Sequence, residues 1–337
     1  MDLRIRKKAV LFSLMSVLFS ILFVTIFSTN FTTTYEDRLP GSNIRIKVLG
    51  DYTKNFQTYV GESVKISTYR TLDAITKYRD SSGRVFFNNF SDFNQTFNNC
   101  MTCGYVNCTN KTAANNCGID QYDIISRMDA IKALSLAELN IQMDYQIQSI
   151  EIQQNYPFEV QVAVNISYNI TDNSGKTNYA QWNKNEIINQ SVSIIGLLDP
   201  AGFINDSTNR YNRTIKRYTG ICEFNEQCWN FTNTEQFYEE QSFRQFKGGI
   251  SFLQRYWNDN NASDCCGIET ILHPQELNPP NLNESYIDNY YWKDIYVCNI
   301  SNSSVQIVNI SLNSDDVHFD TGTAARYRVN AQKYCPS

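Results

Sequence analysis

The spacing of apolar residues predicts two amphipathic helices in the first half of the chain. Over residues 49–79 apolar side chains recur every three or four positions, and residues 81–83 (Ser-Ser-Gly) supply a stop. A second run with the same period predicts a helix over residues 124–145. Ahead of the first helix, residues 44–48 alternate as in a short strand, and residues 39–41 (Leu-Pro-Gly) are expected to break any helix that arrives from the N-terminus.

After the second predicted helix, apolar and polar residues alternate strictly, as in β-strands. Residues 158–168 alternate apolar with polar side chains, residues 172–175 carry turn-forming side chains, and residues 187–197 alternate again, which predicts a β-hairpin. Asparagines alternate with apolar residues in both strands, so we expect one sheet face in water and the other against the helices. Residues 147–152 also have strand character, and residues 305–312 predict a final strand.

An uncharged stretch of twenty residues, 9–28, predicts a membrane span. At about 1.5 Å per residue, such a helix is about 30 Å long, which matches the core of a bilayer. Residues 4–8 are mostly basic, so the positive-inside rule leaves the N-terminus in the cytoplasm and the rest of the chain outside. The alternative is a cleaved secretory signal, whose apolar core is normally about 7–15 residues long. The longer run favours a retained single-pass helix in the cell membrane, with the lipid bilayer as a partner.

Glycosylation sequons, Asn-x-Ser/Thr, are dense after this span. The chain has 39 Asn and 52 Ser plus Thr in 337 residues, so chance gives about six sequons, whereas sixteen occur. Glycans attach to exposed asparagines of exported proteins, which predicts a heavily glycosylated ectodomain. The acceptors are Asn30, Asn89, Asn94, Asn107, Asn110, Asn165, Asn169, Asn189, Asn205, Asn212, Asn230, Asn261, Asn283, Asn299, Asn302 and Asn309.

Ten cysteines also lie after the predicted span, and we expect them to form disulfides. The alternative is a metal site, since the cluster that begins Cys100-x-x-Cys103 offers four thiolates; two sequons inside it and the lack of His make a closed metal cage less suitable. Adjacent Cys265 and Cys266 are expected to bond different partners, because a bridge between neighbours is strained. The cysteines are Cys100, Cys103, Cys108, Cys117, Cys222, Cys228, Cys265, Cys266, Cys298 and Cys335.

Together these signals predict an α+β fold: an N-terminal transmembrane helix, then amphipathic helices packed on an antiparallel sheet, with a disulfide-linked, loop-rich region. The expected parts begin with a cytoplasmic basic stub (1–8), the span (9–28) and an ectodomain core (35–200) that contains a Cys-rich loop (84–118). An aromatic, glycosylated insertion (201–300) follows, with a helical patch near residues 235–257, and a closing strand and tail (301–337) end the chain.

Short motifs spread over most of the chain carry a family resemblance. They are Lys7-Lys8-Ala9-Val10-Leu11, Val64-Lys65-Ile66-Ser67-Thr68-Tyr69-Arg70, Ile194-Ile195-Gly196-Leu197-Leu198-Asp199-Pro200, Gly249-Ile250-Ser251-Phe252-Leu253, Cys266-Gly267-Ile268-Glu269-Thr270 and Tyr286-Ile287-Asp288-Asn289-Tyr290-Tyr291-Trp292. Together they resemble type IV pilin-like archaeal membrane-anchored surface glycoproteins.

In such proteins a dedicated peptidase cuts after a basic–Gly/Ala pair, and the freed apolar helix packs into a filament core. The resemblance therefore implies processing at Lys8, Ala9 and Val10, with Val10 as the new first residue, and self-assembly through the N-terminal helix. Many pilins have Glu at the fifth mature position, where this chain has Leu14; archaeal members often lack that Glu.

The sequence offers little catalytic chemistry. It has two histidines, His273 and His318, and no nucleophile, zinc-protease, phosphate-loop or dinucleotide motif. His318 lies in the acidic segment 315–320, which we interpret as a solvated turn rather than a cation site. Basic residues form no long runs in a chain with net charge −5, which argues against nucleic acid as a partner. No cofactor and no metal are expected.

We therefore expect a non-enzymatic cell-surface protein with a structural or adhesive role. A monomeric membrane-tethered ectodomain that binds a saccharide or peptide is the alternative, and a hydrolase is a third reading without a motif to support it. Cell-surface proteins or glycans are the expected partners. The candidate contact residues are the aromatics Tyr286, Tyr290, Tyr291 and Trp292, for which burial against the sheet is the competing interpretation.

Overall fold

The computed structural model describes residues 40–77, 87–173, 181–203, 213–220, 222, 228–257, 259, 261–277, 285–291, 307–329 and 332–333. The chain divides into two compact units, residues 1–52 and residues 53–337. The span predicted over residues 9–28 lies outside the described residues, among which no helix is long and apolar enough to cross a membrane. The fold class is α+β, with helices and antiparallel sheets, as predicted.

The first described element is one long helix, α2 (Pro40–Lys77). It confirms the helix predicted over residues 49–79, but it begins earlier, so the strand expected at residues 44–48 is wrong. Proline is well suited to the first turn of a helix, where no hydrogen bond needs its missing N–H. Each further residue then adds one helical hydrogen bond, and this outweighs a short alternating pattern.

A helix also forms inside the predicted Cys-rich loop. This helix, α3 (Phe90–Cys103), is capped by Asn89, whose side chain accepts a 3.0 Å hydrogen bond from the amide of Asp92. Its buried residues fall at helical spacing: Phe93, Phe97, Cys100, Met101 and Cys103. The expectation of a continuous loop over residues 84–118 was therefore wrong, because cysteines and phenylalanines supply the apolar face.

The second predicted helix, α4 (Ile124–Leu139), is confirmed, but it ends before residue 145. Asn140 adopts φ 52°, a left-handed conformation that asparagine tolerates and that ends helices. Strand β1 (Ile141–Tyr156) begins immediately afterwards. Apolar residues that seemed to continue the helix therefore belong to a strand.

Three antiparallel strands in the order β1-β2-β3 form the main sheet, with β2 (Glu159–Asp172) in the centre and β3 (Gln181–Ser193) on the other edge. The predicted hairpin is confirmed, with Asn165 opposite Ile187 and Ala163 opposite Asn189, but its second strand is residues 181–193 and not 187–197. Even-numbered residues of β2 from Val160 onward are buried, and odd-numbered ones are half-exposed.

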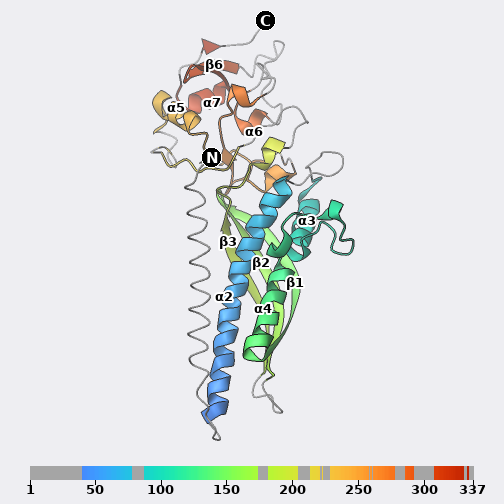
Figure 1. The fold of residues 1–337 in the computed structure, drawn as a ribbon. Coiled ribbons are helices and arrows are strands. Elements are labelled where there is room, and N and C mark those ends of the chain that lie inside the picture. The colour runs from blue at the N-terminus through green and yellow to red at the C-terminus, as the bar shows by residue number, and fades with distance from the viewer. Residues whose placement is uncertain are drawn as a thin grey trace, which may run out of the picture. The chain divides into compact units, whose positions relative to one another are not determined.

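Among the described residues, helices cover one face of this sheet. Figure 1 shows α4 and residues 53–77 of α2 lying along it, and the ring of Phe56 contacts that of Tyr168 at 4.9 Å. The Gln57 amide donates to Tyr168 Oη at 3.1 Å and to Glu186 at 2.7 Å. The hydroxyl of Tyr145 in β1 donates to Asp129 of α4 at 2.8 Å. The opposite face carries the odd-numbered residues of β2 and β3.

The C-terminal half is made of short elements around an aromatic core. They are α5 (Phe231–Glu239), β4 (Arg244–Gln245), β5 (Ile268–Glu269), α6 (Asp288–Tyr291), β6 (Ile307–Leu312), β7 (Asp315–Asp320), α7 (Thr321–Arg326) and β8 (Gln332–Lys333), with 3-10 turns at Pro200–Phe203, Gln254–Tyr256 and Pro274–Glu276. Trp229 contacts Tyr218, Phe237 and Tyr327 at ring-centroid distances of 4.8–5.7 Å. Of the helical patch predicted near residues 235–257, only the part within α5 and one 3-10 turn is helical.

The predicted strand over residues 305–312 is present as β6, but it is not the final one. Asn313 and Ser314 have φ of 49° and 71°, which makes a tight hairpin turn into β7. Segment 315–320 is therefore a strand with Val317 and Phe319 in the core, and its assignment as a solvated turn was wrong.

Candidate functional site

Ten of the sixteen sequon asparagines lie among the described residues, and none of these ten is buried. Six are exposed: Asn89, Asn107, Asn110, Asn189, Asn230 and Asn261. Four are half-buried: Asn94, Asn165, Asn169 and Asn309. The other six acceptors, Asn30, Asn205, Asn212, Asn283, Asn299 and Asn302, fall outside the described residues. These positions suit a modification that requires access to water.

Three of these asparagines share the face of the sheet that no described helix covers. The register places Asn189 opposite Ala163 and Asn165 opposite Ile187, so Asn165, Asn169 and Asn189 project from the same side. The helices occupy the other side, as expected from the alternation. This sheet surface therefore carries three sequon asparagines on one regular face.

Two exposed acceptors are also helix N-caps. Asn89 Oδ1 accepts from the Asp92 amide at 3.0 Å, and Asn230 Oδ1 accepts from the Asn233 amide at 2.9 Å. A glycan is attached through Nδ2, which leaves Oδ1 available for capping. These caps and glycosylation are therefore compatible.

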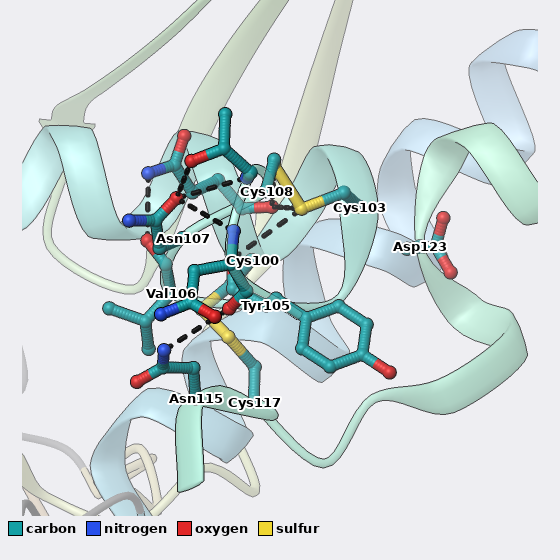
Figure 2. Close-up of a disulfide and its surroundings, with 12 residues drawn as sticks. Cys100, Cys103, Tyr105, Val106, Asn107, Cys108, Asn115, Cys117 and Asp123 are labelled. Atoms are coloured by element: carbon teal, nitrogen blue, oxygen red, sulfur yellow. Dashed lines mark hydrogen bonds between the residues drawn. A yellow bond between two sulfur atoms is a disulfide. The ribbon is translucent and has the colours of Figure 1, made fainter. Parts of the chain in front are cut away.

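The Cys-rich cluster forms two disulfides, Cys100–Cys117 and Cys103–Cys108, as Figure 2 shows. The prediction that these four cysteines form disulfides is confirmed. A third bridge joins Cys222 to Cys228.

Cys265 and Cys266 are bonded to each other, so the expectation of separate partners was wrong for this pair. Both sulfurs face the carbonyl of Gln154, with Cys266 Sγ at 3.0 Å, and Ser263 Oγ accepts from the Cys266 amide at 3.1 Å. The turn thereby holds the two side chains together. Cys298 and Cys335 lie outside the described residues.

We call residues 104–118 the cystine loop. Backbone hydrogen bonds join its two sides, from Val106 N to Asn115 O (2.8 Å) and from Cys117 N to Gly104 O (2.9 Å). Asn107 Oδ1 accepts from Thr109 N at 3.0 Å and Thr109 Oγ1 at 2.6 Å, so this sequon is folded into a tight turn (Figure 2). These hydrogen bonds and the two disulfides constrain the loop, which carries the sequons at Asn107 and Asn110.

Loss of the Cys100–Cys117 bridge should destabilise the protein more than loss of Cys103–Cys108. The bridges close 17 and 5 residues of sequence, and loop-closure entropy then gives about 3 and about 2 kcal/mol. Paired Cys→Ser variants, compared by urea unfolding, test this order. Equal losses would contradict it.

Several motifs that carry the family resemblance meet at one buried arginine, Arg255. Its guanidinium donates to Asp199 at 2.8 Å, to Asp288 at 2.6 Å and to the carbonyl of Ile268 at 2.9 Å. Asp288 Oδ1 also accepts from the Thr270 amide at 3.0 Å. Arg255, Asp199 and Asp288 are buried, so these motifs are joined by a charged core.

A second buried cluster surrounds Glu269. Arg244, Arg326 and Tyr327 donate to its carboxylate at 3.0, 2.9 and 2.8 Å. Burial alone would raise the pKa of Glu269, but Arg326 and Arg244 hold that pKa below its usual value. Both clusters pair buried charges of opposite sign, one arginine with two aspartates and one glutamate with two arginines, which is typical of a structural core.

Acidification from pH 7 to 5 should stabilise the protein through Asp288. Burial and neighbouring Asp199 outweigh Arg255 and raise the pKa of Asp288 to about 6, whereas an unfolded Asp has a pKa of about 3.9. The folded state therefore binds more protons between these values, so its stability rises as pH falls, by about 1 kcal/mol between pH 7 and 5 and by at most about 3 kcal/mol at lower pH. Because the pKa of Glu269 is lowered in the folded state, protonation of this group destabilises the protein, but only below its unfolded pKa of about 4.3.

Urea midpoints at pH 7 and pH 5 measure this gain, with Asp288→Asn as the comparison. The variant should lose most of the difference between the two pH values. An equal difference in both proteins would assign the effect to another group.

The proposed contact residues are not a free aromatic surface. Tyr286 is 1% exposed and its ring lies 5.0 Å from that of buried His318. The contact prediction for Tyr286 was therefore wrong, because it belongs to the core. The side chains of Tyr290 and Tyr291, and all of Trp292, lie outside the described part.

One feature escaped the sequence analysis: a hollow of about 550 Å³ beside the cystine loop. Arg70, Asp73, Ala74 and Lys77 of α2 line one side of it. Their spacing of three and four positions places them on one face of the helix. No sequence pattern indicates that residues 113–122 lie opposite this face.

Comparison with protein-family models, curated proteins and solved structures finds no match to this chain.

Proposed function

We propose that this protein is a non-enzymatic, cell-surface glycoprotein of pilin-like design, with a structural or adhesive role. Residues 9–28 would anchor it in the membrane, and the folded part would stand outside the cell. The observation that carries the proposal is the sheet face that bears Asn165, Asn169 and Asn189 while helices cover the other face. N-linked glycans are attached to exposed asparagines of exported proteins, so several acceptors on one water-facing surface support an extracellular location.

The disulfides and the helix-on-sheet layout support the same proposal. Stable disulfides are typical of oxidising compartments outside the cytoplasm. A long helix laid along an antiparallel sheet is also the arrangement expected of a pilin-like head, in which the helix continues from the membrane anchor. α2 has 38 residues, which corresponds to about 57 Å.

The mature N-terminus tests the pilin-like part of the proposal. Mass spectrometry of protein purified from membranes should give a chain that begins at Val10, after cleavage between Ala9 and Val10. A chain that begins at Met1 would contradict pilin-type processing and leave a tethered protein.

The alternative function is a monomeric, membrane-tethered ectodomain that binds a saccharide or peptide. The hollow beside the cystine loop favours it, because its volume falls within the range of about 300–1,000 Å³ that small ligands occupy. Detergent-solubilised protein would then remain monomeric, whereas a filament subunit would self-associate.

A further inference from the structure

We propose that the hollow beside the cystine loop binds the carboxylate-bearing end of an acidic saccharide. One wall is the face of α2 formed by Arg70, Asp73, Ala74 and Lys77. The other wall comes from the cystine loop and the turn after it: Ala113, Ala114, Asn116, Cys117, Gly118, Ile119 and Tyr122. Three of the lining residues are alanines, whose small side chains leave the space open.

The hollow is built from parts that are held in place without a ligand. The Cys100–Cys117 disulfide ties the loop wall to α3. The Ser67 hydroxyl of α2 donates to the Tyr122 carbonyl at 2.5 Å, which ties the loop wall to the helix wall. Asn116 Oδ1 accepts from the Gly118 amide at 2.7 Å and fixes the turn between them. A site with fixed walls loses little entropy when a ligand binds.

The charge of the hollow selects a monoanion. Lys77 is paired with Asp73 at 2.7 Å, whereas Arg70 makes no ion pair within the described residues. The Arg70 guanidinium lies over the Tyr122 ring, 4.8 Å from its centroid. A guanidinium held over an aromatic ring still has N–H donors in its own plane, which can bind a carboxylate through two hydrogen bonds.

The remaining groups suit a sugar ring. Tyr122 is 40% exposed and offers an aromatic surface to C–H groups. The Asp73 carboxylate and the Asn116 amide can hydrogen-bond hydroxyls. Because Asp73 stands in the same hollow, a dianionic phosphate would be repelled more strongly than a single carboxylate. A uronic acid at the end of a surface glycan combines the required carboxylate, hydroxyls and apolar ring face.

This inference rests on the saccharide-binding alternative proposed above, but its test does not depend on the anchor. Titration calorimetry of the full-length protein in detergent with tri-galacturonate should show saturable binding, and neutral maltotriose should not bind. Arg70→Gln should weaken tri-galacturonate binding about tenfold or more, since it removes a charge-assisted pair of hydrogen bonds. Ala74→Leu should weaken it by filling the hollow while the charge is unchanged.

Lys65→Gln is the matched control, because Lys65 is a charged residue of α2 that does not line the hollow. It should bind within twofold of the unmodified protein, and all three variants should retain its thermal midpoint. No saturable binding of tri-galacturonate, equal binding of maltotriose, or equal weakening by Lys65→Gln and Arg70→Gln would overturn the proposal. A mature N-terminus at Met1 would leave it standing, so the two proposals fail separately.

Discussion

Replacing Arg255 by Gln should destabilise the folded protein by about 3–5 kcal/mol, the cost of removing one partner from a buried ion pair. The Arg255 side chain is fully buried between Asp199 and Asp288 and donates to both. Glutamine carries no charge, so two carboxylates would be left facing each other without a counter-ion. The measured quantity is the free energy of unfolding in urea at pH 7.

Lys65→Gln serves as the control for charge removal. Lys65 pairs with Glu62 at 2.8 Å on the surface of α2, with both side chains largely exposed. Such pairs contribute about 0–1 kcal/mol. A loss below about 1 kcal/mol for Arg255→Gln would mean that the buried cluster is not what joins the motifs.

Gly267→Ala should be nearly as damaging, with an expected loss of about 3 kcal/mol, the upper end of the range for overpacked cores. An added Cβ would lie 2.5 Å from the carbonyl oxygen of Gly249 and closer still to that of Phe246. Both obstacles are backbone atoms, and the Phe246 amide donates to the Gly267 carbonyl at 2.9 Å. The backbone would have to separate and lose that hydrogen bond.

Gly50→Ala provides the opposite control in urea unfolding. Gly50 lies within α2, and an added Cβ there meets nothing within 4 Å. Alanine at an open helical site should stabilise by about 0.5–1 kcal/mol. If both alanine variants unfold at the same urea concentration, close backbone packing at Gly267 is not important for stability.

Local periodicity predicted those elements whose faces are set by neighbours in sequence. Helices α2 and α4 and the β2–β3 hairpin carry long, regular patterns, and all were found. Their ends were less predictable, because one residue decides each: Pro40 starts α2 and Asn140 ends α4. Such single positions leave no trace in a periodic pattern.

Apart from β6 and part of α5, the elements of the C-terminal half were not predicted, because distant segments form its core. Arg255 joins Asp199, 56 residues away, and the Tyr256 hydroxyl donates to the Leu72 carbonyl, 184 residues away. Strands β4 and β5 have two residues each, too short for an alternating pattern. The family-like motifs marked this core in the sequence, but only the fold brings them together.

Functional residues with a local sequence motif were also predicted, whereas those defined by contacts between distant segments were not. Sequons and cysteines are recognised from local sequence, and the described asparagines are accessible as expected. Tyr286 was misassigned because an aromatic residue gives no local signal of whether it is buried. The hollow was missed because Arg70 and Tyr122 meet across 52 residues of sequence.

The central claim is that the folded part of the chain stands outside the cell and carries glycans. Protease shaving of intact cells that produce the protein, followed by mass spectrometry of the released peptides, tests it most directly. We expect glycopeptides containing Asn107, Asn189 or Asn230 to be released without cell lysis. Release of these peptides only after lysis, with all three asparagines unmodified, would contradict the account.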